Sequence, residues 1–181
     1  GPIATQTMLS VGDRKITGFF SGVIEGRTLL EERRQMVQAV TDAKLPFLVA
    51  GTPGFGQGLG PVCYAAFLCM SRFALVPAGN SPETIRLYDA LEAGAIPVML
   101  RSAFVSAPDA LDNPPFLLLD SWSELAAAYA PYANADAPQV VAAIEAKRIE
   151  VLAWWQSFKA KQQRQLKELI DRSFDRTNAG S

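Results

Sequence analysis

Short, continuously apolar runs alternate along this chain with segments in which apolar residues recur at helical spacing. Strands are expected at residues 15–22, 45–51, 73–79, 95–100 and 115–120. Helices are expected at residues 29–43, 61–72, 82–93 and 121–130. Because the strand segments are apolar throughout, both faces of the sheet should be covered by helices. The pattern predicts an α/β, Rossmann-like domain with a mostly parallel sheet of about five or six strands and a long C-terminal helix.

Two details of this arrangement can be predicted. The run 73–77 should be the central strand with 95–100 beside it, because both are apolar without interruption. In the first helix, the residues at helical spacing are Leu30, Arg34, Val37 and Val40 or Thr41.

Four segments are expected along the chain. Residues 1–14 begin with Gly-Pro, which resembles the scar of a cleaved expression tag, and should be disordered or loosely attached. Residues 15–136 should form the Rossmann-like domain. Residues 137–174 are a charged helix or helix pair that should pack Trp154 or Trp155 with Phe158 against the domain, and residues 175–181 should be a frayed tail.

Composition excludes several kinds of function. With 17 basic and 18 acidic residues, the net charge of −1 predicts no nucleic-acid partner and no attraction to an anionic membrane surface. No window is apolar enough to predict a membrane span. Histidine is absent, so catalysis by a Ser/His or Cys/His pair is excluded, and no metal signature is present. Cys63 and Cys69 are poorly spaced for a disulfide on one helix and are expected to be buried thiols.

Ligands of an open parallel sheet bind beyond the carboxyl ends of its strands. Three loops are expected there: residues 21–27, 51–60 and 78–83. The second loop, "GTPGFGQGLG", lacks a dinucleotide fingerprint and predicts a surface loop or a lid. In the third, Ser81 is expected as the N-cap of a helix that has Pro82 at its first position.

Arg86 and Asp89 follow Ser81 along the expected helix. Ser81 and Asp89 would be separated by roughly 12 Å of helical rise, a length that suits a nucleotide diphosphate lying along the helix. The diphosphate would bind at the helix N-terminus and the ribose at Asp89. The alternative, a surface ion pair between Arg86 and Asp89, remains equally open at this stage.

The stretch "SRFALVPAGNSPETIRLYDALEAGAIPVML", followed by "PPFLLLDSWSEL" and preceded by "ITGFFSG", resembles the signature of exostosin-like glycosyltransferases. The resemblance spans roughly residues 15–160 and is densest over 71–100. It implies the C-terminal, nucleotide-sugar-binding half of a GT-B enzyme, which needs no obligatory metal or cofactor. Asp89 would hold the ribose hydroxyls of a UDP-type donor. Ser81-Pro82 falls where retaining relatives have a glutamate, which implies inverting transfer to a glycan acceptor.

The resemblance and the loop chemistry together define the candidate site. The expected donor-binding residues are Gly79, Asn80, Ser81, Pro82, Glu83, Thr84, Arg86 and Asp89. Further donor contacts are expected from Ser21, Gly22 and Arg27. No catalytic residue is assigned, because the acceptor site of such an enzyme lies in a facing N-terminal half. That half, or self-association, is the expected protein partner.

Two further expectations follow from the resemblance. For a eukaryotic protein it implies the Golgi lumen or a membrane-associated place in the secretory pathway; the sequence itself leaves the compartment open. The alternative function is a stand-alone, non-catalytic domain of the same fold that binds nucleotides or carbohydrates or serves as a scaffold.

Overall fold

The computed structural model describes residues 8–24, 31–54 and 57–178, with side chains as far as residue 173. Its strands are β1 (Ile16–Val23), β2 (Phe47–Thr52), β3 (Ser71–Leu75), β4 (Ile96–Leu100) and β5 (Leu117–Leu119). Its α-helices are α1 (Glu31–Asp42), α2 (Pro61–Cys69), α3 (Ile85–Ala93), α4 (Ala103–Ser106), α5 (Leu125–Tyr129) and α6 (Pro138–Asn178). Short 3-10 helices are η1 (Val11–Asp13), η3 (Trp122–Glu124) and η4 (Ala130–Tyr132).

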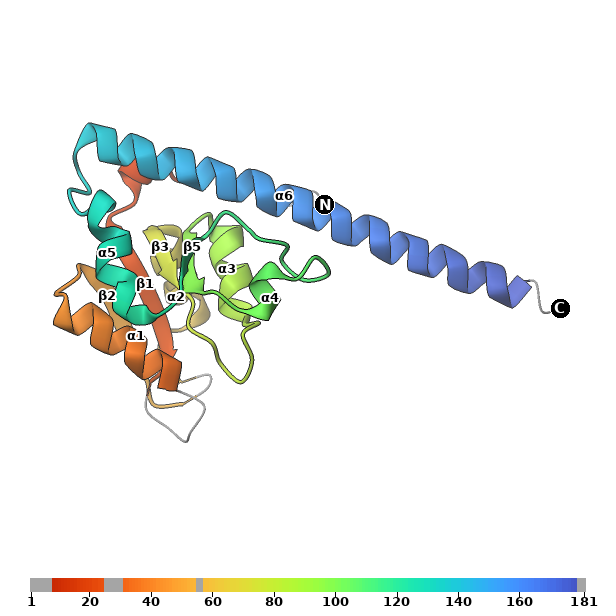
Figure 1. The fold of residues 1–181 in the computed structure, drawn as a ribbon, viewed down its shortest axis with the longest axis horizontal. Helices are drawn as coiled ribbons and strands as arrows, with labels where there is room; N and C mark the ends of the chain where they lie inside the picture. The colour runs from red at the N-terminus through yellow and green to blue at the C-terminus, as the bar shows by residue number, and fades with distance from the viewer. Residues whose placement is uncertain (1–7, 25–30, 55–56, 179–181) are drawn as a thin grey trace.

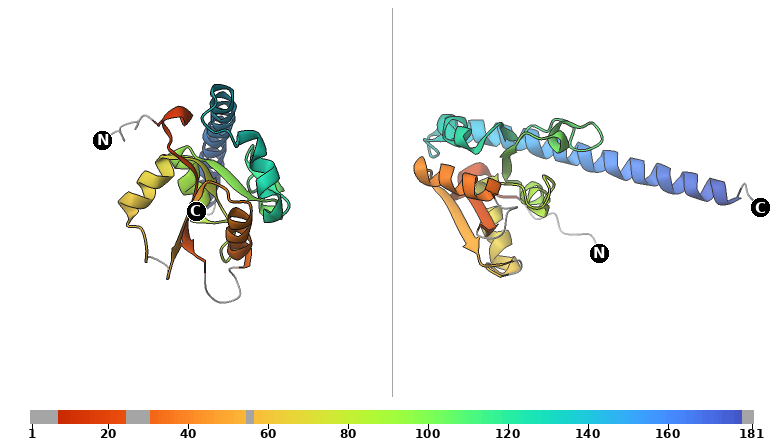
Figure 2. Two further views of the ribbon diagram at one scale, coloured as in Figure 1. Left: turned by 90° about the vertical axis from the view of Figure 1, so that its left-hand side faces the viewer. Right: turned by 60° about the horizontal axis from the view of Figure 1, so that its bottom comes forward.

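The five strands form one parallel sheet in the order β2-β1-β3-β4-β5 (Figure 1). The prediction of an α/β fold with a mostly parallel sheet is confirmed, as is the central place of β3 beside β4. Helices cover both faces of the sheet (Figure 2). On one face, Phe47 packs edge-on against Tyr129 of α5, and on the other Phe19 contacts Phe67 of α2.

Burial explains why the strand segments are continuously apolar. All five residues of β3 are buried, and four of the five in β4. Phe19 and Phe20 of β1 point to opposite faces, and both are almost fully buried. Trp122 is the bulkiest fully buried side chain and closes the core beneath α1. These buried side chains hold the carboxyl ends of the strands, and the loops that follow them, in fixed positions.

The buried face of α1 differs from the predicted one. The helix buries Arg33, Met36 and Val40, whereas Arg34 is exposed and pairs with Glu31 on the surface. The prediction failed at Arg34 because five consecutive polar residues open the helix, so the periodicity rested on few apolar positions. Leu30, which anchored that prediction, lies outside the described residues.

Residues 8–14 are attached to the domain, so the expectation of a loose N-terminal segment was wrong for them. Val11 is fully buried, and its amide donates to the Glu145 carboxylate of α6 at 2.8 Å. Arg14 is also fully buried, and its guanidinium donates to the carbonyls of Leu9, Ser71 and Ala93. Because Arg14 bonds to carbonyls at the start of β3 and at the end of α3, it fixes residues 8–14 to the amino end of the sheet.

The C-terminal segment is one continuous helix that crosses the domain and then extends beyond it (Figure 1). Trp155 is buried and donates to Glu92 of α3 at 3.0 Å, and Phe158 packs beside it, as predicted. The chain is still helical at residues 175–178, where we expected a frayed tail; residues 179–181 lie outside the described part. No described helix has both the length and the apolar character needed to cross a lipid bilayer.

The cysteines depart in part from prediction. Both thiols are free, but Cys63 is exposed and Cys69 is half-buried. Both residues belong to α2, which is apolar around its whole circumference and nevertheless buries only Leu68 fully. The expectation of buried thiols failed because apolar character alone does not reveal how much of a helix is covered.

Candidate functional site

The strand order defines where a ligand would bind. β1 and β3 are neighbours, and the chain continues outward from β1 to β2 in one direction and from β3 to β4 in the other. In such a sheet the crevice beyond the carboxyl ends of these two strands is the usual ligand site. The residues that surround this point come from the end of β1, the start of α1, the loop after β3, and α3.

Arg86 of α3 reaches across to the end of β1. Its Nε donates to the carbonyl of Ser21 at 2.9 Å, and its guanidinium lies 5.4 Å from the ring centre of Phe20. The guanidinium also occupies the space beside Gly22, where any Cβ would clash with Nη2. Glycine is therefore required at position 22 for Arg86 to lie in this place. Three of the predicted site residues meet here.

Arg33 of α1 places a second guanidinium at the carboxyl ends of β1 and β3. It is buried, and it donates to the carbonyl of Val23 at 2.8 Å and to that of Ala78 at 3.2 Å. Its Nη2 lies 3.2 Å from the position that a Cβ at Gly79 would occupy. Burial, and next the positive charge of Arg86, lower the pKa of Arg33, and burial lowers that of Arg86.

Both guanidiniums are held chiefly by backbone carbonyls. Among the described residues, neither Arg33 nor Arg86 forms an ion pair with a carboxylate. Carbonyl oxygens satisfy N–H donors but do not neutralise their charge. Glu32 and Asp89 attract Arg33 and Arg86 electrostatically without forming ion pairs with them. A guanidinium fork suits phosphate oxygens in particular.

Glu32 fixes the loop that follows β3. Its Oε1 accepts from the backbone amide of Ala78 at 3.0 Å and from the indole of Trp122 at 3.2 Å. Since Trp122 is fully buried, the carboxylate is anchored to the core and the loop is anchored to the carboxylate. Glu32 and Arg33 thus hold the start of the 77–84 loop from both its amide and its carbonyl side.

Asp89 lies one turn after Arg86 and faces α2. Its Oδ2 accepts from the hydroxyl of Tyr64 at 3.2 Å, and its second oxygen has no partner among the described residues. Burial, followed by the negative charge of Asp89, raises the pKa of the Tyr64 phenol to about 12. Tyr64 is therefore a neutral donor that orients the Asp89 carboxylate.

The start of α3 corrects the sequence prediction. The N-cap is Thr84, whose backbone is extended and whose Oγ1 accepts from the Arg86 amide at 3.3 Å. The hydroxyl of Ser81 instead donates to the carbonyl of Glu83, and the Glu83 carboxylate accepts from Tyr88. Both hydroxyl residues can cap a helix, and the chain uses the one nearer to Leu87, the first buried residue of α3. The 12 Å helical rise from Ser81 to Asp89 is wrong, because residues 81–84 are not helical.

This cap assignment predicts unequal effects of two similar substitutions. Thr84→Ala should lower the free energy of unfolding by about 1 kcal/mol, since it removes the side-chain acceptor at the first turn. Ser81→Ala should change it by less than about 0.5 kcal/mol, because Ser81 is an exposed turn residue. Urea unfolding followed by circular dichroism measures both. A larger effect at Ser81 than at Thr84 would contradict the observed cap.

The structure groups the predicted site residues unequally. It places Ser21 and Gly22 against Arg86, with Asp89 one turn further along α3, and it places Gly79 against Arg33. Asn80, Ser81, Pro82 and Glu83 form an exposed turn beside it. Arg27 lies outside the described residues.

Sequence reasoning missed Glu32, Arg33 and Tyr64. The only signal for Arg33 was its spacing of three residues before Met36, which places both on the buried face.

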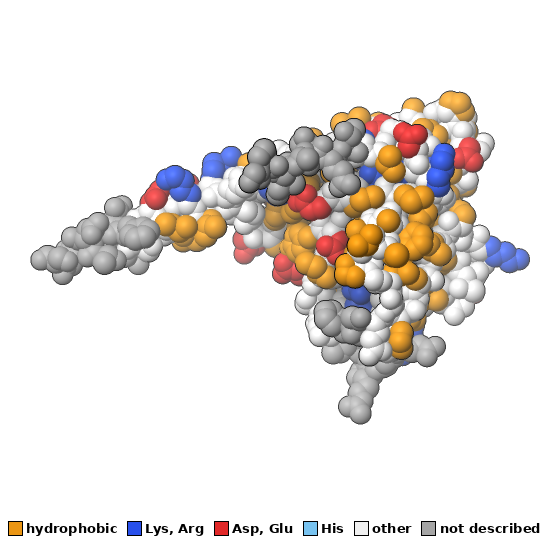
Figure 3. All heavy atoms as spheres, turned by 180° about the vertical axis from the view of Figure 1, so that it is seen from behind, with side chains coloured by type: hydrophobic (Ala, Val, Ile, Leu, Met, Phe, Trp, Pro, Cys, Tyr) orange, Lys and Arg blue, Asp and Glu red, His pale blue; other side chains and the backbone are white. Residues whose placement is uncertain are grey.

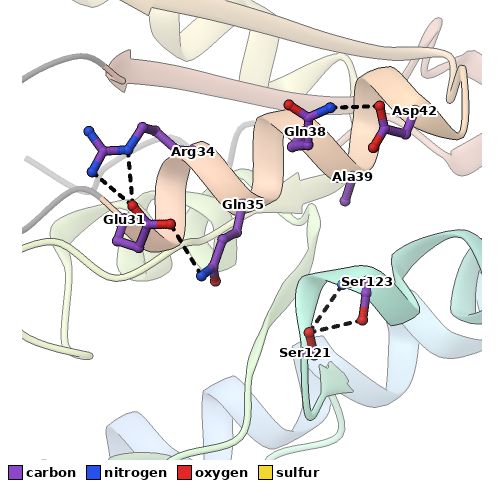
Figure 4. A pocket seen from close by; sticks show the side chains of 8 residues that line it. All are labelled: Glu31, Arg34, Gln35, Gln38, Ala39, Asp42, Ser121 and Ser123. Atoms are coloured by element: carbon purple, nitrogen blue, oxygen red, sulfur yellow. Dashed lines mark hydrogen bonds and ion pairs between the residues drawn. The ribbon is translucent and has the colours of Figure 1, made fainter.

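A larger hollow lies elsewhere and suits a ligand less well. It measures about 460 Å³ and is open, between the outer side of α1 and the turn at Ser121. Its polar side chains are already paired with one another: Arg34 and Gln35 with Glu31, Gln38 with Asp42, and Ser123 with Ser121 (Figure 4). Its two acids, Glu31 and Asp42, outnumber its one base, Arg34, so the hollow does not favour an anion and we place the candidate site at the switch point. Among the described residues no acidic or cysteine cluster could hold a metal ion.

The fold and the site residues define an α/β, Rossmann-like domain with two neighbouring guanidiniums at the switch point of its sheet. A family model described as the RXYLT1 C-terminal domain matches residues 61–175, more than half of the chain. The chain belongs to this exostosin-like glycosyltransferase family, so the resemblance inferred from its sequence is confirmed. No curated protein matches the chain. The matched region contains Tyr64, Arg86 and Asp89, whereas Gly22 and Arg33 precede it.

Proposed function

We propose that this domain binds the nucleotide-sugar donor of an exostosin-like glycosyltransferase, with a UDP-type donor as substrate. Family membership supports a glycosyltransferase-related role. The observation that carries the finer proposal is the pair of guanidiniums, Arg33 and Arg86, at the switch point between β1 and β3. They lie where a Rossmann-like sheet binds ligands and carry positive charge that backbone carbonyls leave unneutralised.

In the proposed complex the diphosphate lies at the carboxyl ends of β1 and β3. Arg86 contacts it directly, and the first amides of α3 face it with the positive end of the helix dipole. Gly22 and Gly79 have no side chain beside Arg86 and Arg33, so that phosphate oxygens can approach the two guanidiniums. The free oxygen of Asp89 accepts from the ribose hydroxyls, and Tyr64 holds the carboxylate in that orientation.

Inverting transfer to a glycan acceptor needs an acceptor site and a general base, which in this proposal a second, facing α/β half supplies. The described domain contributes donor binding and charge stabilisation of the departing diphosphate by Arg86 and Arg33. The isolated chain should therefore bind UDP without transferring sugar.

Asp89 provides the direct test. Asp89→Ala should weaken UDP binding by about 1–2 kcal/mol, five- to thirtyfold, because a charge-assisted hydrogen bond to the ribose is lost. Isothermal titration calorimetry measures this loss. Asp109→Ala is the matched control, since Asp109 is an exposed acid outside the crevice.

A UDP analogue without ribose hydroxyls tests whether Asp89 acts through the ribose. With 2′,3′-dideoxy-UDP, which lacks the ribose hydroxyls, wild type and Asp89→Ala should bind equally. Absence of UDP binding by the wild-type chain would overturn the proposed function and favour a scaffold domain of the same fold.

A further inference from the structure

One side of the molecule carries an apolar surface that no described residue covers. Leu48 of β2 is 40% exposed, and Val62 and Met70, at the two ends of α2, are 83% and 36% exposed. Figure 3, seen from behind the view of Figure 1, shows hydrophobic side chains gathered on this side of the body. We define the α2–β2 face by its exposed residues: Leu48, Val62, Cys63, Ala65, Ala66 and Met70.

The sheet order explains why this face is open. β2 is the edge strand, and Leu48 pairs in register with Phe19 of β1, so both side chains point to the same face of the sheet. The ring of Phe19 lies beneath α2, in contact with Tyr64 and Phe67 at 5.9 and 5.8 Å. α2 thus covers β1 and β3 but leaves β2 exposed beside it. Parallel sheets are normally covered on both faces, so a covering layer is missing over β2.

The same part of the chain contains no charge. From residue 45 to residue 71 there is no lysine, arginine, aspartate or glutamate, although 19% of all residues are charged. Edge strands that remain solvated usually carry a charge or a proline, and Phe47–Thr52 has neither. α2 is apolar on all sides, which is typical of a buried helix and not of a surface one.

We propose that the α2–β2 face is a self-association surface, at which two copies of this chain pack through the same face about a two-fold axis. An uncharged face can meet its own copy without like-charge repulsion, as a two-fold interface requires. The net charge of −1 adds almost no repulsion between whole molecules. An anionic membrane surface fits less well, because the face offers no basic side chain.

The experiment is the mass of the full chain by sedimentation equilibrium over a hundredfold concentration range. Wild type should pass from the monomer mass of 19.6 kDa to twice that value. Val62→Glu places a charge on the face at its 83% exposed valine and should weaken dimerisation by at least about tenfold. The matched control is Ile149→Glu, the same kind of change at a 57% exposed isoleucine on α6, and it should dimerise like wild type.

The native thiol gives a second readout. Cys63 lies on the face, so its alkylation by iodoacetamide should slow as wild type is concentrated, and should not slow for Val62→Glu. Comparing each variant with itself removes any effect of the new glutamate on the thiol. A wild-type chain that stays monomeric, or a dimer that Val62→Glu leaves unchanged, would overturn the proposal. A monomer whose Cys63 becomes protected only when the second enzyme half is added would identify that half as the occupant instead.

Discussion

Arg14→Met should lower the free energy of unfolding by about 3 kcal/mol. The guanidinium donates to the carbonyls of Ser71 and Ala93 at 2.8 Å each, and both acceptors lose their partner in the variant. An unsatisfied buried acceptor costs about 1–3 kcal/mol. Methionine fills the volume of the arginine stem, so the loss reports the hydrogen bonds more than a cavity.

One opposing contribution keeps this effect from being larger. Burial and the neighbouring charge of Arg148 lower the pKa of Arg14 to about 10, so the arginine remains charged at neutral pH at some cost. The variant removes this cost. Urea unfolding measures the difference, and Arg34→Met is the control, because its exposed ion pair with Glu31 should contribute less than about 1 kcal/mol. An equal midpoint for Arg14→Met and wild type would mean that the hydrogen bonds of Arg14 make no net contribution to the stability of the domain.

The fold could be predicted from sequence because its strongest signals are local. Continuous apolar runs identified the strands, and their lack of alternation identified a sheet covered on both faces. The N-terminal segment could not be predicted in this way. Val11 and Arg14 owe their positions to Glu145, Ser71 and Ala93, which are distant in sequence. No periodicity within residues 8–14 contains that information.

The candidate site shows the same division. Arg86 and Asp89 could be predicted, because helical spacing and family resemblance both single them out. Arg33 could not, since in "EERRQ" it cannot be told from Arg34 without knowing which side of α1 faces the sheet. Tyr64 could not be predicted as a site residue, because a single hydroxyl in an otherwise apolar helix forms no recognisable polar pattern. The cap of α3 failed for a related reason: Ser81 and Thr84 have equivalent cap chemistry, and tertiary packing of Leu87 selects between them.

Gly22→Ala and Arg86→Ala should both weaken UDP binding, by about 1.5–3 kcal/mol for the arginine, which is ten- to more than a hundredfold. Arg86→Ala removes the proposed phosphate contact. Gly22→Ala acts through the same side chain, because the new methyl group would occupy the space of the Arg86 guanidinium and displace it. The displaced group is the end of a flexible side chain, so Gly22→Ala should cost less than about 1.5 kcal/mol of stability.

The double variant makes the test specific. If Gly22 matters only because it makes room for Arg86, the losses of Gly22→Ala and Arg86→Ala will not add, and the double variant will bind UDP as Arg86→Ala does. Gly12→Ala is the control, because a Cβ there meets only ordinary contacts at 3.8 Å and beyond. Gly12 lies at the amino end of the sheet, before β1. Calorimetry with UDP, together with thermal unfolding of each variant, separates lost binding from lost stability. Additive losses would show that Gly22 contacts the ligand by itself, and unchanged affinity in Arg86→Ala would remove the guanidinium from the donor site.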